Sequence, residues 1–175
     1  MKKYLSLIFL SVLALAGCST LSDLTKINLP FSQSVEVPAI PLTIDSIPLS
    51  TPEIETNIDS VFTKYNISTD FVESVKLNSF KISIDENDSA DLSFFSNIKI
   101  YITGENLSTV KIASATAVGD VREIDFTVED VDLKDYILSD KFGLKIVAGS
   151  DETTKVSHKI NIDMDVTLDA KVLGL

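Results

Sequence analysis

The sequence has few of the residues from which most catalytic centres are built. Its 175 residues include one cysteine, one histidine and no tryptophan. A single cysteine excludes an intramolecular disulfide, and a zinc site needs three or four Cys or His ligands. Nucleophilic catalysis needs a base beside an activated Ser or Cys, and His158 lies in a polar run where we expect it at the surface. Gly-x-Ser-x-Gly and phosphate-binding glycine motifs are also absent from the sequence. We therefore expect that the chain is not an enzyme.

Positive charge is scarce as well. The chain has 15 Lys and Arg residues against 26 Asp and Glu residues, a formal net charge of −11. An acidic surface repels phosphate backbones and anionic headgroups, so we expect no nucleic-acid partner and no docking on lipid by charge alone. The hydrophobic fraction of 45% is too high for a disordered chain. The length fits a single folded domain.

The N-terminus has the pattern of a targeting segment. Lys2 and Lys3 precede an apolar run from Leu5 to Ala16, which is shorter than the roughly 20 residues that span a bilayer. Such a run is typical of a secretory signal peptide. It ends in Leu15-Ala16-Gly17-Cys18, which resembles the lipobox of bacterial lipoproteins.

That resemblance implies that residues 1–17 are removed and that Cys18 carries a lipid such as palmitate. Two or three acyl chains hold a protein firmly to a membrane, so the membrane itself is the expected partner of Cys18. Ser19 follows the cysteine, where the inner-membrane retention signal of enterobacteria has Asp, and this favours the outer membrane of the cell envelope. A Gram-positive source would instead place the anchor on the plasma membrane, and an ordinary cleaved signal is the alternative.

The mature chain predicts a short tether followed by strands. We assign residues 18–33 to the lipidated N-terminus and tether, and residues 34–175 to one domain. Residues 35–49 contain three prolines and predict an irregular edge strand. Thr51 and Pro52 predict the start of a helix over 52–65, and residues 130–138 predict a short helical turn.

The clearest strand is the last one. Apolar residues take every second position from Ile160 to Val172, and Asp163, Asp165 and Asp169 lie between them. This alternation indicates one buried and one solvated face. Together with the earlier alternating segments it predicts seven or eight strands at about ten-residue spacing. The predicted fold class is therefore all-β, an antiparallel β-sandwich with one or two short helices.

A family resemblance points the same way. Its elements are Lys76-Leu77-x-x-Phe80-x-Ile82, the pair Phe94-Phe95, the strand 98–102, and the stretch Asp132 to Tyr136. This pattern resembles uncharacterised lipoproteins of the Bacteroidetes, whose domain is a β-sandwich. The resemblance implies fold and source, and it offers no active site.

Three sets of residues are candidate sites. Asp85, Asn87, Ser89 and Asp91 alternate like the first ligands of an EF-hand, although Ala90 and Ser96 replace the expected Gly and Glu, so the set predicts either a loose calcium loop or a solvated acidic turn. The acidic face of Asp163, Asp165 and Asp169 could hold a cation or a partner, or simply face water. Asp88-Ser89-Ala90 matches the O-glycosylation pattern of Bacteroidetes envelope proteins, which makes Ser89 a candidate acceptor.

These observations favour a lipid-anchored, non-catalytic envelope β-sandwich that acts as a binding or structural module for an unidentified protein or glycan. No cofactor is expected, except calcium if the loop binds it. The alternatives are a calcium-dependent adhesin and a hydrolase built on carboxylates alone. A deep pocket containing a carboxyl with a raised pKa would favour the hydrolase, and shallow grooves would favour the binding module.

Overall fold

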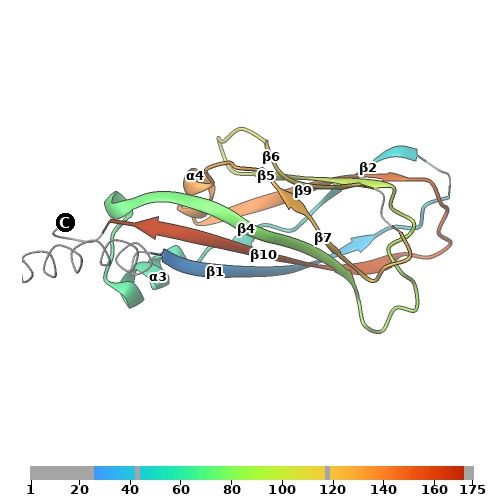
Figure 1. The fold of residues 1–175 in the computed structure, drawn as a ribbon, viewed down its shortest axis with the longest axis horizontal. Coiled ribbons are helices and arrows are strands. Elements are labelled where there is room, and N and C mark those ends of the chain that lie inside the picture. The colour runs from blue at the N-terminus through green and yellow to red at the C-terminus, as the bar shows by residue number, and fades with distance from the viewer. Residues whose placement is uncertain (1–25, 42–43, 117–118, 172–175) are drawn as a thin grey trace, which may run out of the picture.

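The computed structural model describes residues 26–41, 44–116 and 119–171. The predicted signal peptide and Cys18 lie outside these ranges. The described chain forms ten strands in two antiparallel sheets that face one another along an elongated molecule (Figure 1). The predicted all-β sandwich is confirmed.

The first sheet has the strand order β1-β10-β4-β7. Its strands are β1 (Lys26–Val37), β10 (His158–Ala170), β4 (Val72–Ile84) and β7 (Glu123–Asp125). The second sheet has the order β2-β9-β5-β6-β8, and β3 also pairs with β9. Its strands are β2 (Ile44–Ser50), β3 (Ile54–Glu55), β5 (Asn97–Thr103), β6 (Val110–Thr116), β8 (Thr127–Val128) and β9 (Lys141–Ser150). The count exceeds the predicted seven or eight because β3, β7 and β8 are too short to show a period.

In the described ranges, three short helical segments connect the strands. They are α3 (Ile58–Tyr65), the 3-10 turn η2 (Thr69–Phe71) and α4 (Lys134–Ile137). The predicted helical turn at 130–138 corresponds to α4. None of the helices in the described ranges is both long and apolar enough to cross a bilayer.

The central strand β10 behaves as its sequence predicts. It pairs with β1 on one side and β4 on the other. Every second residue from His158 to Ala170 is buried, while Asp163 and Asp165 are exposed and Asp169 is partly exposed. The predicted alternation is confirmed as far as Ala170, and Val172 lies outside the described residues. Isoleucine, valine and leucine on this face each stabilise the fold by about 1.5–3 kcal/mol through burial.

The N-terminal part of the domain differs from its prediction. Strand β1 begins at Lys26, so residues 26–33 belong to the sheet and not to the tether. The single edge strand expected over 35–49 is divided between β1 and β2, which lie in different sheets. Both are edge strands, which explains why Pro30 and Pro48 are tolerated within them.

The predicted helix start is also wrong. Thr51 does not cap a helix, because its N–H donates to the Leu144 carbonyl and its Oγ1 accepts from the Leu144 N–H. Residues 54–55 then form β3 against β9. The helix begins only at Ile58, after Asn57 turns the chain with a φ of 50°. Pairing with β9 therefore outweighs the local signal of Thr51 and Pro52.

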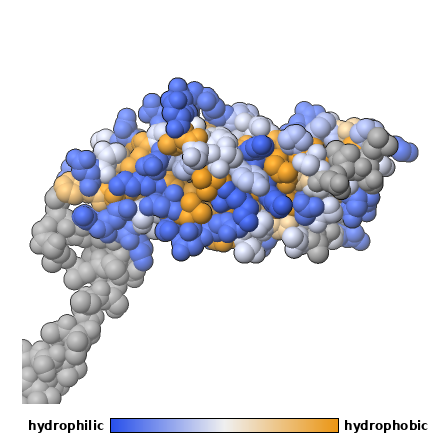
Figure 2. Space-filling view, turned by 90° about the horizontal axis from the view of Figure 1, so that it is seen from above, coloured by the Kyte–Doolittle hydropathy of each residue, from blue (hydrophilic) through white to orange (hydrophobic). Residues whose placement is uncertain are grey.

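The core runs along the whole interface between the two sheets. Its largest fully buried side chains include Phe80, Phe95 and Phe142. Phe80 packs edge-on against Phe126 at 5.2 Å, and Phe31 packs against Phe142 at 5.3 Å. The face in Figure 2 is mostly hydrophilic, with apolar residues in small separate groups. On this face the apolar residues therefore form no continuous patch.

Candidate functional site

The strand register gathers functional side chains at one end of the sandwich. Val37, the last residue of β1, lies opposite His158, the first residue of β10. Ile84, the last residue of β4, lies opposite Ile160. The loop that follows β4 therefore folds over the start of β10, at the end of the molecule opposite Lys26 (Figure 1). We call this end, with residues 85–96 and 151–159, the distal end.

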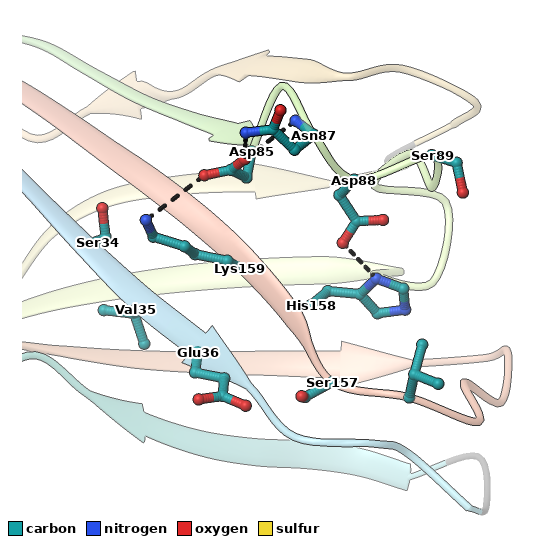
Figure 3. A pocket seen from close by; sticks show the side chains of 11 residues that line it. Ser34, Val35, Glu36, Asp85, Asn87, Asp88, Ser89, Ser157, His158 and Lys159 are labelled. Carbon is teal, nitrogen blue, oxygen red and sulfur yellow. Dashed lines mark hydrogen bonds and ion pairs between the residues drawn. The ribbon is translucent and has the colours of Figure 1, made fainter.

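The distal end carries an open cleft with a volume of about 740 Å³. It is formed by the end of β1, the loop after β4 and the start of β10 (Figure 3). Its lining residues are Ser34, Val35, Glu36, Asp85, Asn87, Asp88, Ser89, Val156, Ser157, His158 and Lys159. Most of these side chains are polar, so the cleft is suited to a hydrophilic ligand.

Three aspartates shape the loop by binding its own backbone. Each carboxylate accepts a hydrogen bond from the N–H two residues further on, as in an Asx-turn. The pairs are Asp85 with Asn87 at 3.0 Å, Asp88 with Ala90 at 2.9 Å, and Asp91 with Ser93 at 3.0 Å. The loop therefore repeats every three residues, whereas the calcium prediction assumed a repeat of two.

These hydrogen bonds lower the pKa of all three carboxyl groups. For Asp85 and Asp88 the main cause is the backbone N–H of Asn87 and Ala90, respectively. For Asp91 the hydroxyl and the backbone N–H of Ser93 have this effect. Donors stabilise the charged form of a carboxylate. A general acid needs a shift in the opposite direction.

Arg122 holds the loop through hydrogen bonds to two of its backbone carbonyls. Its guanidinium donates to the Ala90 carbonyl at 2.6 Å and to the Asp85 carbonyl at 3.0 Å. The Leu92 N–H donates to the Val121 carbonyl at 2.8 Å. Because both ends of the loop are fixed in this way, the cleft is organised before any ligand arrives, which lowers the entropy cost of binding.

His158 is buried, and the prediction that it lies at the surface is wrong. It is 8% exposed, and its Nδ1 lies 2.8 Å from Asp88 Oδ2. Its ring stacks on Phe94 with centroids 5.2 Å apart. The sequence around His158 is polar, and the residues that cover it come from a loop about 70 positions earlier. No local pattern could reveal that contact.

The second ring nitrogen of His158 lies on the ring edge away from Asp88, in a residue that lines the cleft. No buried side-chain nitrogen or oxygen of the described residues lacks a hydrogen-bond partner. Within the same residues, Nδ1 is the ring nitrogen of His158 that has a hydrogen-bond partner. Figure 3 shows Nδ1 turned to Asp88 and Nε2 on the other edge of the ring. This nitrogen is therefore free to accept from or donate to a ligand.

Two further charged groups lie in the cleft. Lys159 Nζ lies 3.5 Å from Asp85 Oδ2, which partly neutralises that carboxylate. Glu36 is exposed and lies opposite Lys159 in the pairing of β1 with β10. The charges available to a ligand are thus mainly negative.

The four residues of the predicted calcium loop do not converge on one point. Asp85 and Asn87 bond to each other, Asp91 bonds to Ser93, and Ser89 is exposed. Within the described part of the chain, no group of three or more His, Cys, Asp or Glu side chains is placed to hold a metal. Calcium binding, like O-glycosylation of Ser89, stays a prediction.

The predicted acidic face lies on the outer surface of the first sheet, away from the cleft. Asp163 accepts a hydrogen bond from Ser32 at 2.6 Å, and Asp165 accepts one from Ser79 at 3.4 Å. Asp169 also has an interaction partner. Neighbouring strands therefore already supply these carboxylates with partners, and their role as a cation or partner face stays a prediction.

No protein-family model matches the chain, and no curated protein is similar to it. Solved structures share its architecture at low identity. A Parabacteroides distasonis protein predicted to be secreted is 15% identical with a TM-score of 0.45, over 77% of this chain and 41% of that one. The C-terminal domain of a Bacteroides fragilis chitobiase is 9% identical with a TM-score of 0.36, over 73% and 66%.

A Clostridium perfringens protein solved in complex with GalNAc-beta-1,3-galactose is 8% identical with a TM-score of 0.37, over 75% of this chain and 94% of that one. At such values the likeness carries no conclusion about this chain. The class of protein is therefore defined by its architecture, and its function has to be argued from the cleft.

Proposed function

We propose that the chain is a lipid-anchored, non-catalytic binding module of the cell envelope, whose distal cleft takes a ligand with a cationic group. The observation that carries this proposal is the position of the cleft relative to Lys26. The 12 residues of β1 span about 40 Å, and they separate the start of the domain from Val37 beside the cleft. A lipid on Cys18 would therefore hold one end of the sandwich at the membrane and leave the cleft accessible.

The lining of the cleft supports a cationic ligand. Glu36 offers an exposed carboxylate that forms no salt bridge with a described residue, and Nε2 of His158 offers a second polar contact. Val156 is 62% exposed beside them and offers an apolar contact. A lysine side chain has an ammonium group at the end of an aliphatic stem, which matches this combination.

We propose that the chain is not catalytic, because of the shape and the chemistry of the cleft. It is open, and its two carboxyl groups with shifted pKa values, Asp85 and Asp88, both shift downward. Two-carboxylate hydrolysis requires one carboxyl that stays protonated near neutral pH. The hydrolase alternative therefore has no observation in its favour here.

The anchor is tested by metabolic labelling with palmitate. We expect the wild-type protein to carry label and to fractionate with membranes. The Cys18→Ala variant should lose both properties, because the acceptor thiol is gone. Label on that variant would contradict the lipid anchor.

The cleft is tested by titrating the full-length lipidated protein, in detergent, with a short lysine peptide. We expect Glu36→Gln to weaken binding several-fold. Asp165→Asn is the matched control, because it removes one negative charge from an exposed position of the first sheet away from the cleft. Equal losses in the two variants would show that the peptide responds only to net charge, which would contradict the proposed site.

A further inference from the structure

The end of the sandwich opposite the cleft is closed by α3 and η2. Here β1 begins at Lys26, and β10 ends at Ala170. The Lys171 N–H donates to the Phe71 carbonyl at 2.7 Å, which fastens η2 to the end of β10. Figure 1 shows α3 beside the start of β1. We call this end, with residues 58–71, the proximal end.

An aromatic side chain projects from the proximal end. Tyr65, the last residue of α3, is 47% exposed. Asn66 ends the helix with a φ of 52°, so Tyr65 lies at a corner of the chain. Lys64 Nζ lies 5.1 Å from the centre of the Tyr65 ring. The corner thus presents an aromatic ring and an ammonium group side by side.

Tyr65 has no counterpart at its own end of the described chain. The other exposed large apolar residues of the described chain, Val121 and Val156, lie near the distal end. The Val121 carbonyl accepts a hydrogen bond from the Leu92 N–H of the distal loop, and Val156 lines the distal cleft. Among the described residues, Tyr65 is therefore the exposed large apolar side chain on the side where β1 begins.

The chain before Lys26 is too short to carry this end far from an anchored lipid. Cys18 and Lys26 are eight residues apart in the sequence. A fully extended chain spans at most about 3.6 Å per residue, so the two residues are separated by at most roughly 29 Å. This distance is shorter than the strand β1 itself.

The charges of the two ends favour the same orientation. At the distal end Asp85, Asp88 and Asp91 lie in one loop. Together with residues 151–159, that loop region holds six acidic residues against two lysines, whereas residues 58–71 at the proximal end hold two acidic residues and one lysine. An anionic membrane surface repels the distal end more strongly than the proximal end.

We propose that the Lys64–Tyr65 corner rests in the headgroup region of the bilayer that holds the lipid on Cys18. The inference rests on the proposed lipid anchor. Tyrosine suits this depth because its ring is apolar and its hydroxyl stays hydrated. The Lys64 ammonium reaches lipid phosphates while its stem lies along the apolar layer. The contact orients the sandwich upright and points the cleft away from the membrane.

The test uses tryptophan fluorescence, because the native chain has no tryptophan. Full-length lipidated Tyr65→Trp protein is reconstituted into phosphatidylcholine vesicles with or without brominated acyl chains, which quench nearby tryptophan. We expect its emission to shift to shorter wavelength and to be quenched by the brominated lipid. Val156→Trp is the matched control, since it places the same reporter at an exposed position of the distal end. Its emission should not change.

Flotation of the same samples separates the two proposals. Protein that floats with the vesicles, but shows equal emission in brominated and plain lipid at position 65, would overturn the membrane contact and leave the anchor intact. Protein that carries no lipid and does not float would overturn the anchor and the contact together. Quenching of both reporters would show that the sandwich lies flat, which also contradicts the upright orientation.

Discussion

At the scale of single residues, His158 determines how the distal end is built. It is a polar side chain buried among a carboxylate, an aromatic ring and the core, and its Nδ1 bonds to Asp88. A buried polar group whose partner is removed loses its solvation without replacement. His158 therefore links the loop after β4 to the first residue of β10, and the cleft depends on this link.

Replacement of His158 by Phe tests this link. Phe keeps the stacking on Phe94 but removes the hydrogen-bond partner of Asp88 Oδ2, while Asp88 Oδ1 still accepts from the Ala90 N–H. We expect the free energy of unfolding to fall by about 1–3 kcal/mol, as measured by urea denaturation. In the His158→Phe background, Asp88→Ala should cost less than in the native protein. A total effect below about 0.5 kcal/mol, which is typical of surface positions, would contradict the buried pair.

Leu168 and Asp165 test the two faces of β10. Leu168 is fully buried, so Leu168→Ala should lower the free energy of unfolding by about 2–5 kcal/mol. Asp165 is exposed in a protein with a net charge of −11, so Asp165→Asn should change stability by no more than about 0.5 kcal/mol. Denaturant melts of both variants measure the difference. Greater damage in the Asp165 variant would show that the acidic face has a structural or ligand-binding role.

At the scale of elements, the loop after β4 is stable because its acids bind its own backbone. Three successive Asx-turns and the Arg122 clamp replace the packing that a strand or helix would supply. The three carboxylates therefore already have a structural role in this loop. A calcium ion would have to compete with these hydrogen bonds.

The loop predicts a specific dependence of stability on pH. The pKa values of Asp85, Asp88 and Asp91 are lower in the folded protein than their ordinary value of about 3.9. Groups of this kind contribute stability above the unfolded pKa, and the contribution is lost as the pH falls through the folded pKa. The free energy of unfolding should therefore decrease below about pH 4, and Asp88→Asn should make this decrease shallower. Parallel acid profiles of the two proteins would contradict the role of Asp88.

The elements also show what sequence can and cannot predict here. Strand β10 was predictable because its alternation is a property of consecutive residues. The start of β1 was missed because Pro30 and its polar neighbours resemble a tether, and only pairing with β10 makes them a strand. The predicted helix start was wrong because Thr51 forms hydrogen bonds with Leu144 of β9 instead of capping a helix. His158 was assigned to the surface because Asp88 and Phe94 lie far from it in the chain.

At the scale of the whole molecule, the two ends of the sandwich have different chemistry. At the proximal end β1 begins at Lys26, eight residues after Cys18, and Lys64 and Tyr65 are presented beside it. The distal end presents an acidic, preorganised cleft. The antiparallel pairing of β1 with β10 places these features at opposite ends of the same strands. Under the proposed anchor and the proposed binding function, the length of the sandwich would separate the membrane from the ligand.

The height of the cleft above the membrane tests this account most directly. In Val156→Cys protein the introduced thiol is the one free thiol under the proposed anchor, because the single native cysteine, Cys18, is then acylated. A donor dye on that thiol and acceptor dyes on lipid headgroups report the height by energy transfer, with Tyr65→Cys as the low reference. The account predicts weak transfer from position 156, at a height of about 40 Å set by β1, and strong transfer from position 65. Equal transfer from the two positions would contradict it.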